Sequence, residues 1–155
     1  MSTNFACAAR LARISRCSST TANGRACRAS EQLVQLYNQQ IANELGASQL
    51  YLSASIWAEQ NELVGMAAYL RTEANEERSH ALEFIDFAHK REFDVRLGAL
   101  AAPPRGWDTV EDLWKAVLEA EKTNTEALKA LHDAAIDDRD HALTGFLEPF
   151  HPLGL

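Results

Sequence analysis

The chain has 155 residues, 46% of them hydrophobic, and a formal net charge of −7, which suits one domain with a proper core. Residues 1–30 hold five arginines and no acid, so the net charge of residues 31–155 alone is −12. A body this acidic repels phosphate backbones, which argues against nucleic-acid binding and favours cations. No apolar run approaches the ~20 residues of a membrane-spanning helix.

The first 30 residues are rich in Ser, Thr, Ala and Arg, a composition typical of a mitochondrial or plastid transit peptide. A plain disordered tail is the alternative, and cleavage would leave a mature chain starting near Ser30. All three cysteines lie in this segment, at Cys7, Cys17 and Cys27. Residues 31–155 therefore have no disulfide framework and no cysteine metal site.

Three long helices are expected next, over about residues 30–58, 61–91 and 108–136. Ser30 and Asn61 are the expected N-caps of the first two helices, each followed by a glutamate in the first turn. The expected inward stripe of the first helix is Val34, Tyr37, Ile41, Glu44, Ser48, Tyr51 and Ser55. That of the third is Val110, Trp114, Val117, Glu121, Asn124, Leu128, Leu131 and Ala135.

The connection between the second and third helices contains two prolines and two glycines, which exclude a helix there. Its 16–18 residues could span about 55 Å, whereas the second helix is only about 45 Å long. The linker can therefore return the third helix parallel to the second, while the tight first turn makes helices one and two antiparallel. This predicts an all-α four-helix bundle with one long crossover between helices two and three. A fourth helix starting near residues 138–140 meets Pro149 and Pro152, so we expect it to be truncated.

The pair Glu77-x-x-His80 lies in the middle of the inward stripe of the second helix. That stripe contains Met66, Leu70, Glu73, Glu77, His80, Phe84 and Phe87, at alternating steps of four and three. Burying a carboxylate without a partner is very costly, and a metal ion is the commonest partner for mixed carboxylate and imidazole groups.

Glu44 and Glu121 lie near the centres of the first and third helices, as Glu77 does in the second. Helices of similar length packed side by side bring these midpoints together, so we expect Glu44, Glu77, His80 and Glu121 to converge. Oxygen ligands with one imidazole favour a pair of iron or manganese ions. Tyr51, two turns from Glu44 on the same face, could donate a hydrogen bond to a metal-bound carboxylate.

The same Glu/Asp-x-x-His spacing recurs at Asp86/His89, Asp138/His141 and Glu148/His151. The first two pairs are expected on the surface, because one is off the stripe and the other is at a helix start. The third would complete a symmetric site on a fourth helix, but it brackets Pro149 and lies too early in that helix to reach the midpoint.

Three segments resemble ferritin: Glu44-Leu-Gly-Ala-Ser-Gln-Leu-Tyr51 in its first helix, Glu76-Glu77-Arg78-Ser79-His80 in its second and Glu121-Lys-Thr-Asn-Thr in its third. The resemblance covers about residues 31–151. Residues 53–57, 65–69 and 146–151 are similar to the ferritins of marine microalgae in particular.

This resemblance implies a ferritin-like bundle that oxidises Fe(II) with dioxygen and stores ferric mineral inside a 24-subunit shell of identical chains. It makes Glu77 the bridge between two irons, Glu44 and His80 the remaining ligands of one iron, and Glu121 the ligand of the other. Tyr51 would supply an electron, and Glu73 would be an auxiliary ligand of a third iron. Of the acidic cluster that nucleates mineral in animal ferritins, only Glu76 is present.

Two alternatives stay open. A rubrerythrin-like di-iron peroxidase would need a second Glu-x-x-His at the middle of helix four. A truncated, non-catalytic subunit could instead co-assemble with full-length partners, because a short fourth helix leaves one apolar side uncovered. The expected location is the plastid, with the mitochondrion as the alternative, and no membrane association is expected.

Overall fold

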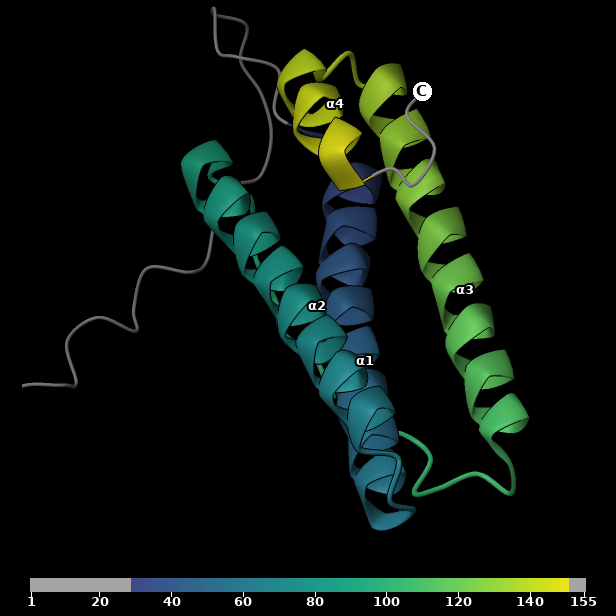
Figure 1. Ribbon diagram of the computed structural model, residues 1–155. Helices are drawn as coiled ribbons and strands as arrows, with labels where there is room; N and C mark the ends of the chain where they lie inside the picture. The colour runs from purple at the N-terminus through teal and green to yellow at the C-terminus, as the bar shows by residue number, and fades with distance from the viewer. Residues whose placement is uncertain (1–28, 151–155) are drawn as a thin grey trace, which may run out of the picture.

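The computed structural model describes residues 29–150, and the expected all-α bundle is confirmed (Figure 1). It contains α1 (Glu31–Gln60), α2 (Val64–Arg91), α3 (Val110–Asp137), the short α4 (His141–Leu147) and a 3₁₀ turn, η1 (Glu148–Phe150). None of these helices is both long and apolar enough to cross a membrane. The predicted transit peptide lies almost entirely outside the described residues, as does His151.

Side-chain caps fix where the helices begin. The Ser30 hydroxyl accepts a hydrogen bond from the Leu33 amide at the start of α1, and the Thr109 hydroxyl accepts one from the Asp112 amide at the start of α3. Each cap pairs one of the amide groups that the first turn of a helix leaves unpaired.

The prediction that Asn61 caps the second helix was wrong. Asn61 instead ends α1, where its Nδ2 donates to the Trp57 carbonyl at 2.8 Å. The chain then turns through Glu62, which has a φ of +61°, and α2 begins only after Leu63. A single Asn between two helices can serve the unpaired carbonyls of the first or the amides of the second, and here it serves the first.

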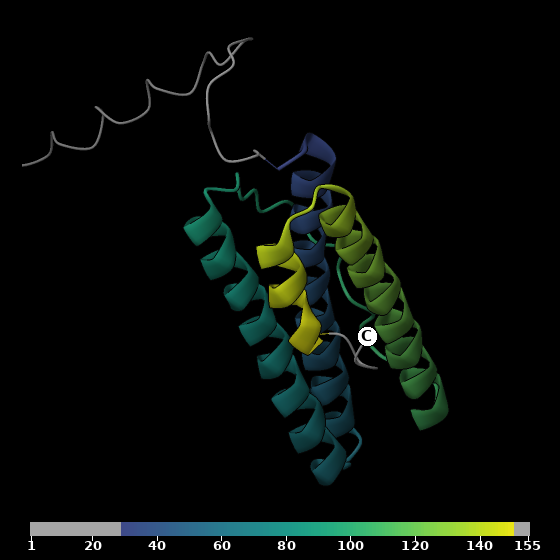
Figure 2. The same ribbon diagram turned by 90° about the horizontal axis from the view of Figure 1, so that it is seen from above.

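α1 is the central helix of the bundle, with α2 antiparallel to it on one side and α3 on the other (Figures 1 and 2). The segment 92–109 runs back along the bundle, so α3 is parallel to α2, as the length of the linker predicted. α4 lies between α2 and α3 at the end where α1 begins.

Two apolar clusters form the core, one on either side of the bundle's middle. The cluster under α4 contains Tyr37, Phe84, Leu131, Leu143 and Leu147 among others. The cluster at the other end contains Leu70, Ala58, Leu113 and Val117 among others.

α4 covers only the first of these clusters, and apolar side chains near the second stay exposed. Tyr69 is 51% exposed, Trp114 37% and Leu118 55%. The expectation that Val110 and Trp114 lie on the buried stripe of the third helix was therefore wrong. Leu113 is buried in their place, in the apolar cluster with Ala58 and Leu70, while the Trp114 ring lies at the edge of the bundle against Tyr69 of α2.

Candidate metal site

The middle of the bundle brings carboxylates from three helices toward one imidazole. Glu44 lies in the middle of α1, Glu77 and His80 lie one turn apart on α2, and Glu121 lies on α3. The two apolar clusters close this level from both ends of the bundle. Helical periodicity places these residues here, because each occupies an inward position on the stripe of its own helix.

Glu44, Glu77 and His80 form the tight part of the site. Each offers one ligand atom, and these atoms lie within 4.8 Å of one another. His80 Nδ1 is 3.5 Å from Glu77 Oε2 and 3.9 Å from Glu44 Oε2. Both of these carboxylate oxygens are buried and have no hydrogen-bond partner. Such oxygens are costly to bury alone, and a cation would satisfy them.

Glu121 lies farther out but lines the same cavity of about 290 Å³ as the other three residues. It is held there by Tyr51, whose hydroxyl donates a 2.6 Å hydrogen bond to Glu121 Oε1. Both the four converging residues and the supporting tyrosine were predicted from the sequence.

Burial and crowding of negative charge shift the protonation of this site. Desolvation, followed by the neighbouring Glu44 carboxylate, raises the pKa of Glu77 to about 9. Desolvation and the hydrogen bond to Glu121 also raise the pKa of Tyr51, so its phenol remains a donor at physiological pH. Without a cation, Glu77 is therefore expected to carry a proton at pH 7.

Gln40 and Asn124 complete the polar contacts of Glu44, and the role of Gln40 was not predicted from the sequence. Gln40 lies one turn before Glu44 on α1, and its Nε2 donates to Glu44 Oε1 at 2.6 Å and to Asn124 Oδ1 at 2.7 Å. The available signal was a polar residue one helical turn from a predicted ligand, on the same face of the helix.

The rings of Pro149 and Phe150 form one wall of the cavity. The Phe150 ring meets the His80 ring edge-on, with centroids 5.4 Å apart, and Pro149 lines the cavity beside it. The Glu148-x-x-His151 pair does not enter the site through Glu148, which is exposed on η1.

The two further glutamates predicted on α2, Glu73 and Glu76, differ in their position relative to the cavity. Glu73 is half-buried one turn before Glu77, and its charge helps to raise the pKa values of Glu77 and Tyr51. Glu76 is exposed on α2 and does not line the cavity. Asp86 and His89 are exposed as predicted.

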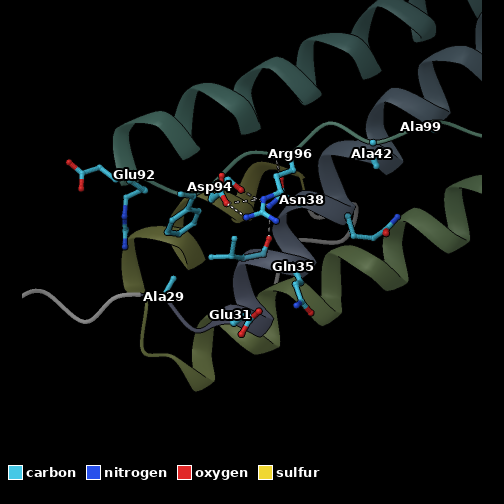
Figure 3. A pocket seen from close by; sticks show the side chains of 14 residues that line it. Ala29, Glu31, Gln35, Asn38, Ala42, Glu92, Asp94, Arg96 and Ala99 are labelled. Carbon is cyan, nitrogen blue, oxygen red and sulfur yellow. Dashed lines mark hydrogen bonds and ion pairs between the residues drawn. The ribbon is translucent and has the colours of Figure 1, made fainter. Parts of the chain in front are cut away.

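A larger cavity of about 820 Å³ lies elsewhere, between the outer face of α1 and the crossover (Figure 3). Asn38 connects the two segments here: its Nδ2 donates to the Asp94 carbonyl at 2.9 Å, and its Oδ1 accepts from the Arg96 amide at 2.6 Å. This cavity contains none of the predicted ligands. Its polar contacts hold the crossover against α1.

Comparison with known proteins agrees with this architecture. A family profile described as "Ferritin-like domain" matches residues 34–151. The bacterial non-heme ferritin of Campylobacter jejuni is 30% identical over 119 residues, which are 77% of this chain and 71% of that protein. The corresponding protein of Bacteroides fragilis is 32% identical over 121 residues, covering 78% and 76% of the two chains.

Solved structures are more similar still. The apo-ferritin from Pseudo-nitzschia multiseries superposes with a TM-score of 0.77 and 48% identity, over 79% of this chain and 78% of that one. A PmFTN variant soaked in iron gives the same TM-score and identity. The residues matched by the family profile, 34–151, include all four residues of the candidate site. The chain belongs to the ferritin family.

Proposed function

We propose that this chain stores iron and oxidises Fe(II) with dioxygen at the site formed by Glu44, Glu77, His80 and Glu121. The observation that carries the proposal is the pair of buried carboxylate oxygens, on Glu44 and Glu77, that face one imidazole and have no hydrogen-bond partner. Membership of the ferritin family and the similarity to a ferritin soaked in iron support iron as the metal.

The ligands fit the chemistry of Fe(II) oxidation. Carboxylate oxygens are hard donors that stabilise Fe(III) more than Fe(II), so bound Fe(II) becomes easier to oxidise. With Glu77 between two ions, Glu44 and His80 would hold one and Glu121 the other. Two Fe(II) ions supply two electrons, which together with two protons reduce dioxygen to hydrogen peroxide. Tyr51, bonded to Glu121, is the nearby group that can donate a further electron.

Proton release accompanies iron binding in this proposal. Because the pKa of Glu77 is raised to about 9 without a cation, an arriving Fe(II) displaces the proton of that carboxyl group. The acidic surface of the body raises the local concentration of cations at the entrance to the site.

The test is aerobic addition of Fe(II), followed by the absorbance of the diferric product. The Glu77→Ala/His80→Ala variant should oxidise Fe(II) at least about 100-fold more slowly than the wild type, since two ligands are lost. The matched control is Asp86→Ala/His89→Ala, which removes the same residue spacing from an exposed part of the same helix. Equal rates in the wild type and the site variant would refute the proposal.

A homo-oligomeric shell is the proposed assembly, of 24 subunits by similarity to the family. A second candidate is a non-catalytic subunit that co-assembles with other ferritin chains, which the exposed Leu118 and Trp114 favour. Size-exclusion chromatography of the purified chain separates the two. Elution at roughly 24 times the mass of one chain supports the shell, and small oligomers or aggregates support the second candidate.

We also propose that the arginine-rich residues 1–30 direct the chain to the plastid. The support is the composition of this segment, which contains five arginines and no acidic residue. A fluorescent protein fused after residue 30 should accumulate in plastids. Accumulation in mitochondria would favour the alternative target, and a diffuse signal would contradict both.

A further inference from the structure

We infer that Gln40 and Asn124 are a positioning pair for Glu44: they bind its Oε1, so that Oε2 alone is presented to a cation. The inference rests on the proposed function, because it concerns how one ligand of that site is oriented. Neither residue touches the other ligands Glu77 and His80 through a hydrogen bond.

The two amide groups reach Glu44 from different helices. Gln40, only 1% exposed on α1, donates both hydrogens of its Nε2, one to Glu44 Oε1 at 2.6 Å and one to Asn124 Oδ1 at 2.7 Å. Asn124 on α3 adds a longer contact, with its Nδ2 3.4 Å from the same Glu44 oxygen. Glu44 Oε1 is therefore bound by donors from both α1 and α3.

The orientation of the Gln40 amide follows from its neighbours. Both neighbouring atoms, Glu44 Oε1 and Asn124 Oδ1, are acceptors in this arrangement. The reversed amide would place its oxygen against the Glu44 carboxylate, so the donor nitrogen must face this side. The Gln40 Oε1 atom is then left buried without a hydrogen-bond partner.

The second oxygen of Glu44 has a different environment. Oε2 is buried without a hydrogen-bond partner and lies 3.9 Å from His80 Nδ1. One carboxylate thus has one oxygen committed to amides and one facing the imidazole and Glu77. Glu44 should accordingly bind a cation through a single oxygen, leaving a coordination position open for dioxygen or a second ligand.

An amide pair suits this task better than a charged partner would. Amide donors stabilise a carboxylate without neutralising it, so the site keeps its full attraction for a cation. Leaving Gln40 Oε1 buried without a partner lowers stability, a cost that an apolar residue at this position would avoid. The positioning of Glu44 accounts for an amide in a place where packing alone favours leucine.

The experiment measures binding of Co(II), a redox-stable probe, to the full chain by its visible absorption spectrum. Gln40→Leu should weaken Co(II) binding by about 10–100-fold. It should also lower the intensity of the visible bands, because the freed Oε1 adds a ligand and Co(II) of higher coordination number absorbs more weakly. Asn124→Leu should act in the same direction by at least about threefold, since the amide of Gln40 loses its second partner.

The matched control is Gln39→Leu. Gln39 is also an amide on α1 that donates to another amide, Asn43 Oδ1 at 2.9 Å, but it is exposed. The Gln39→Leu variant should leave both the dissociation constant of Co(II) and its visible spectrum unchanged. The double variant Gln40→Leu/Asn124→Leu should resemble Gln40→Leu alone, because the two residues act as one unit.

The outcomes separate this inference from the proposed function. If the wild type binds no Co(II), both fail. If the wild type binds Co(II) and Gln40→Leu keeps its affinity and spectrum, only the positioning role is refuted, and additive effects in the double variant refute the pairing. If the Gln40→Leu variant loses its helical circular dichroism, the Asn124→Leu variant becomes the test, because Asn124 is only half-buried. Wild-type affinity for Co(II) in Asn124→Leu would then overturn the inference.

Discussion

Tyr51 and Glu121 join α1 to α3 beside the candidate metal site through a hydrogen bond of 2.6 Å. Tyr37, about four turns earlier on α1, donates a hydrogen bond of similar length, 2.7 Å, to the backbone carbonyl of Phe84 on α2. Burial raises the pKa of both phenols, so both stay protonated donors at physiological pH. One tyrosine therefore supports a predicted ligand, Glu121, and the other supports only the core.

This difference predicts separable effects of removing the two hydroxyls. Tyr51→Phe frees Glu121, so binding of a second Co(II) should weaken by about tenfold, as calorimetric titration would show. Tyr37→Phe removes the side-chain hydrogen bond to the Phe84 carbonyl, which should lower the free energy of unfolding by about 1 kcal/mol in urea titrations. It should not change Co(II) binding. Equal effects of the two variants on Co(II) affinity would contradict the role assigned to Tyr51.

The raised pKa of Glu77 predicts how the metal-free protein responds to pH. The group titrates near its ordinary value of 4.5 when unfolded and at about 9 when folded, so between these values the folded state binds more protons. The free energy of unfolding should therefore fall as pH rises from about 4.5 to about 9. By pH 8 the loss should reach a few kcal/mol, measured by urea denaturation in the presence of a chelator.

Glu77→Gln is the control for this pH dependence, because it keeps the shape of the side chain and cannot ionise. The variant should lose most of the slope between pH 4.5 and 9 and should be more stable than the wild type at pH 8 without metal. An unchanged slope would show that another group causes it.

Metal removal should destabilise the protein most at alkaline pH, where no proton competes for Glu77. Excess metal at about 100 times its dissociation constant adds about 2.7 kcal/mol to the free energy of unfolding. Thermal unfolding of the Co(II)-loaded wild type at pH 8 should therefore shift down by several degrees after chelation. The Glu77→Ala/His80→Ala variant should show no such shift, and a shift equal to that of the wild type would place the ion elsewhere.

Helical periodicity was sufficient to predict that the four candidate ligands lie around one cavity. Glu44, Glu77, His80 and Glu121 each occupy an inward position at the middle of a long helix, so the sequence alone brings them to one level. The crossover was also predictable, since a linker longer than the helix beside it permits a parallel return. Both inferences depend only on the geometry of single helices and on chain length.

Features that depend on contacts between helices were not predictable in this way. Trp114 fits the inward period of α3 as well as Leu113 does, and only the packing against the neighbouring helices selects Leu113. The role of Gln40 depends on Asn124, 84 residues away, and on which way an amide faces. Asn61 could serve either neighbouring helix, and local sequence does not decide between them.

Asp140 connects the short α4 to the bundle and combines two functions. Its carboxylate caps α4 by accepting from the Leu143 amide at 3.1 Å, and it receives two hydrogen bonds from Arg91 on α2, at 2.9 and 2.7 Å. This ion pair is bidentate and largely buried, with exposed side-chain fractions of 29% and 9%. The segment that follows α4 places Phe150 against His80, so the Arg91–Asp140 ion pair that holds α4 also supports the candidate site.

Asp140→Ala removes both the cap and the ion pair, and should lower the free energy of unfolding by about 2–4 kcal/mol in urea titrations. Asp140→Asn retains a capping oxygen but loses the charge, so its loss should be about half as large. Both variants should also weaken Co(II) binding modestly, because a loosened α4 no longer fixes Phe150 against the imidazole. If Asp140→Ala matched the stability of the wild type, α4 would be held by the apolar contacts of Leu143 and Leu147 alone.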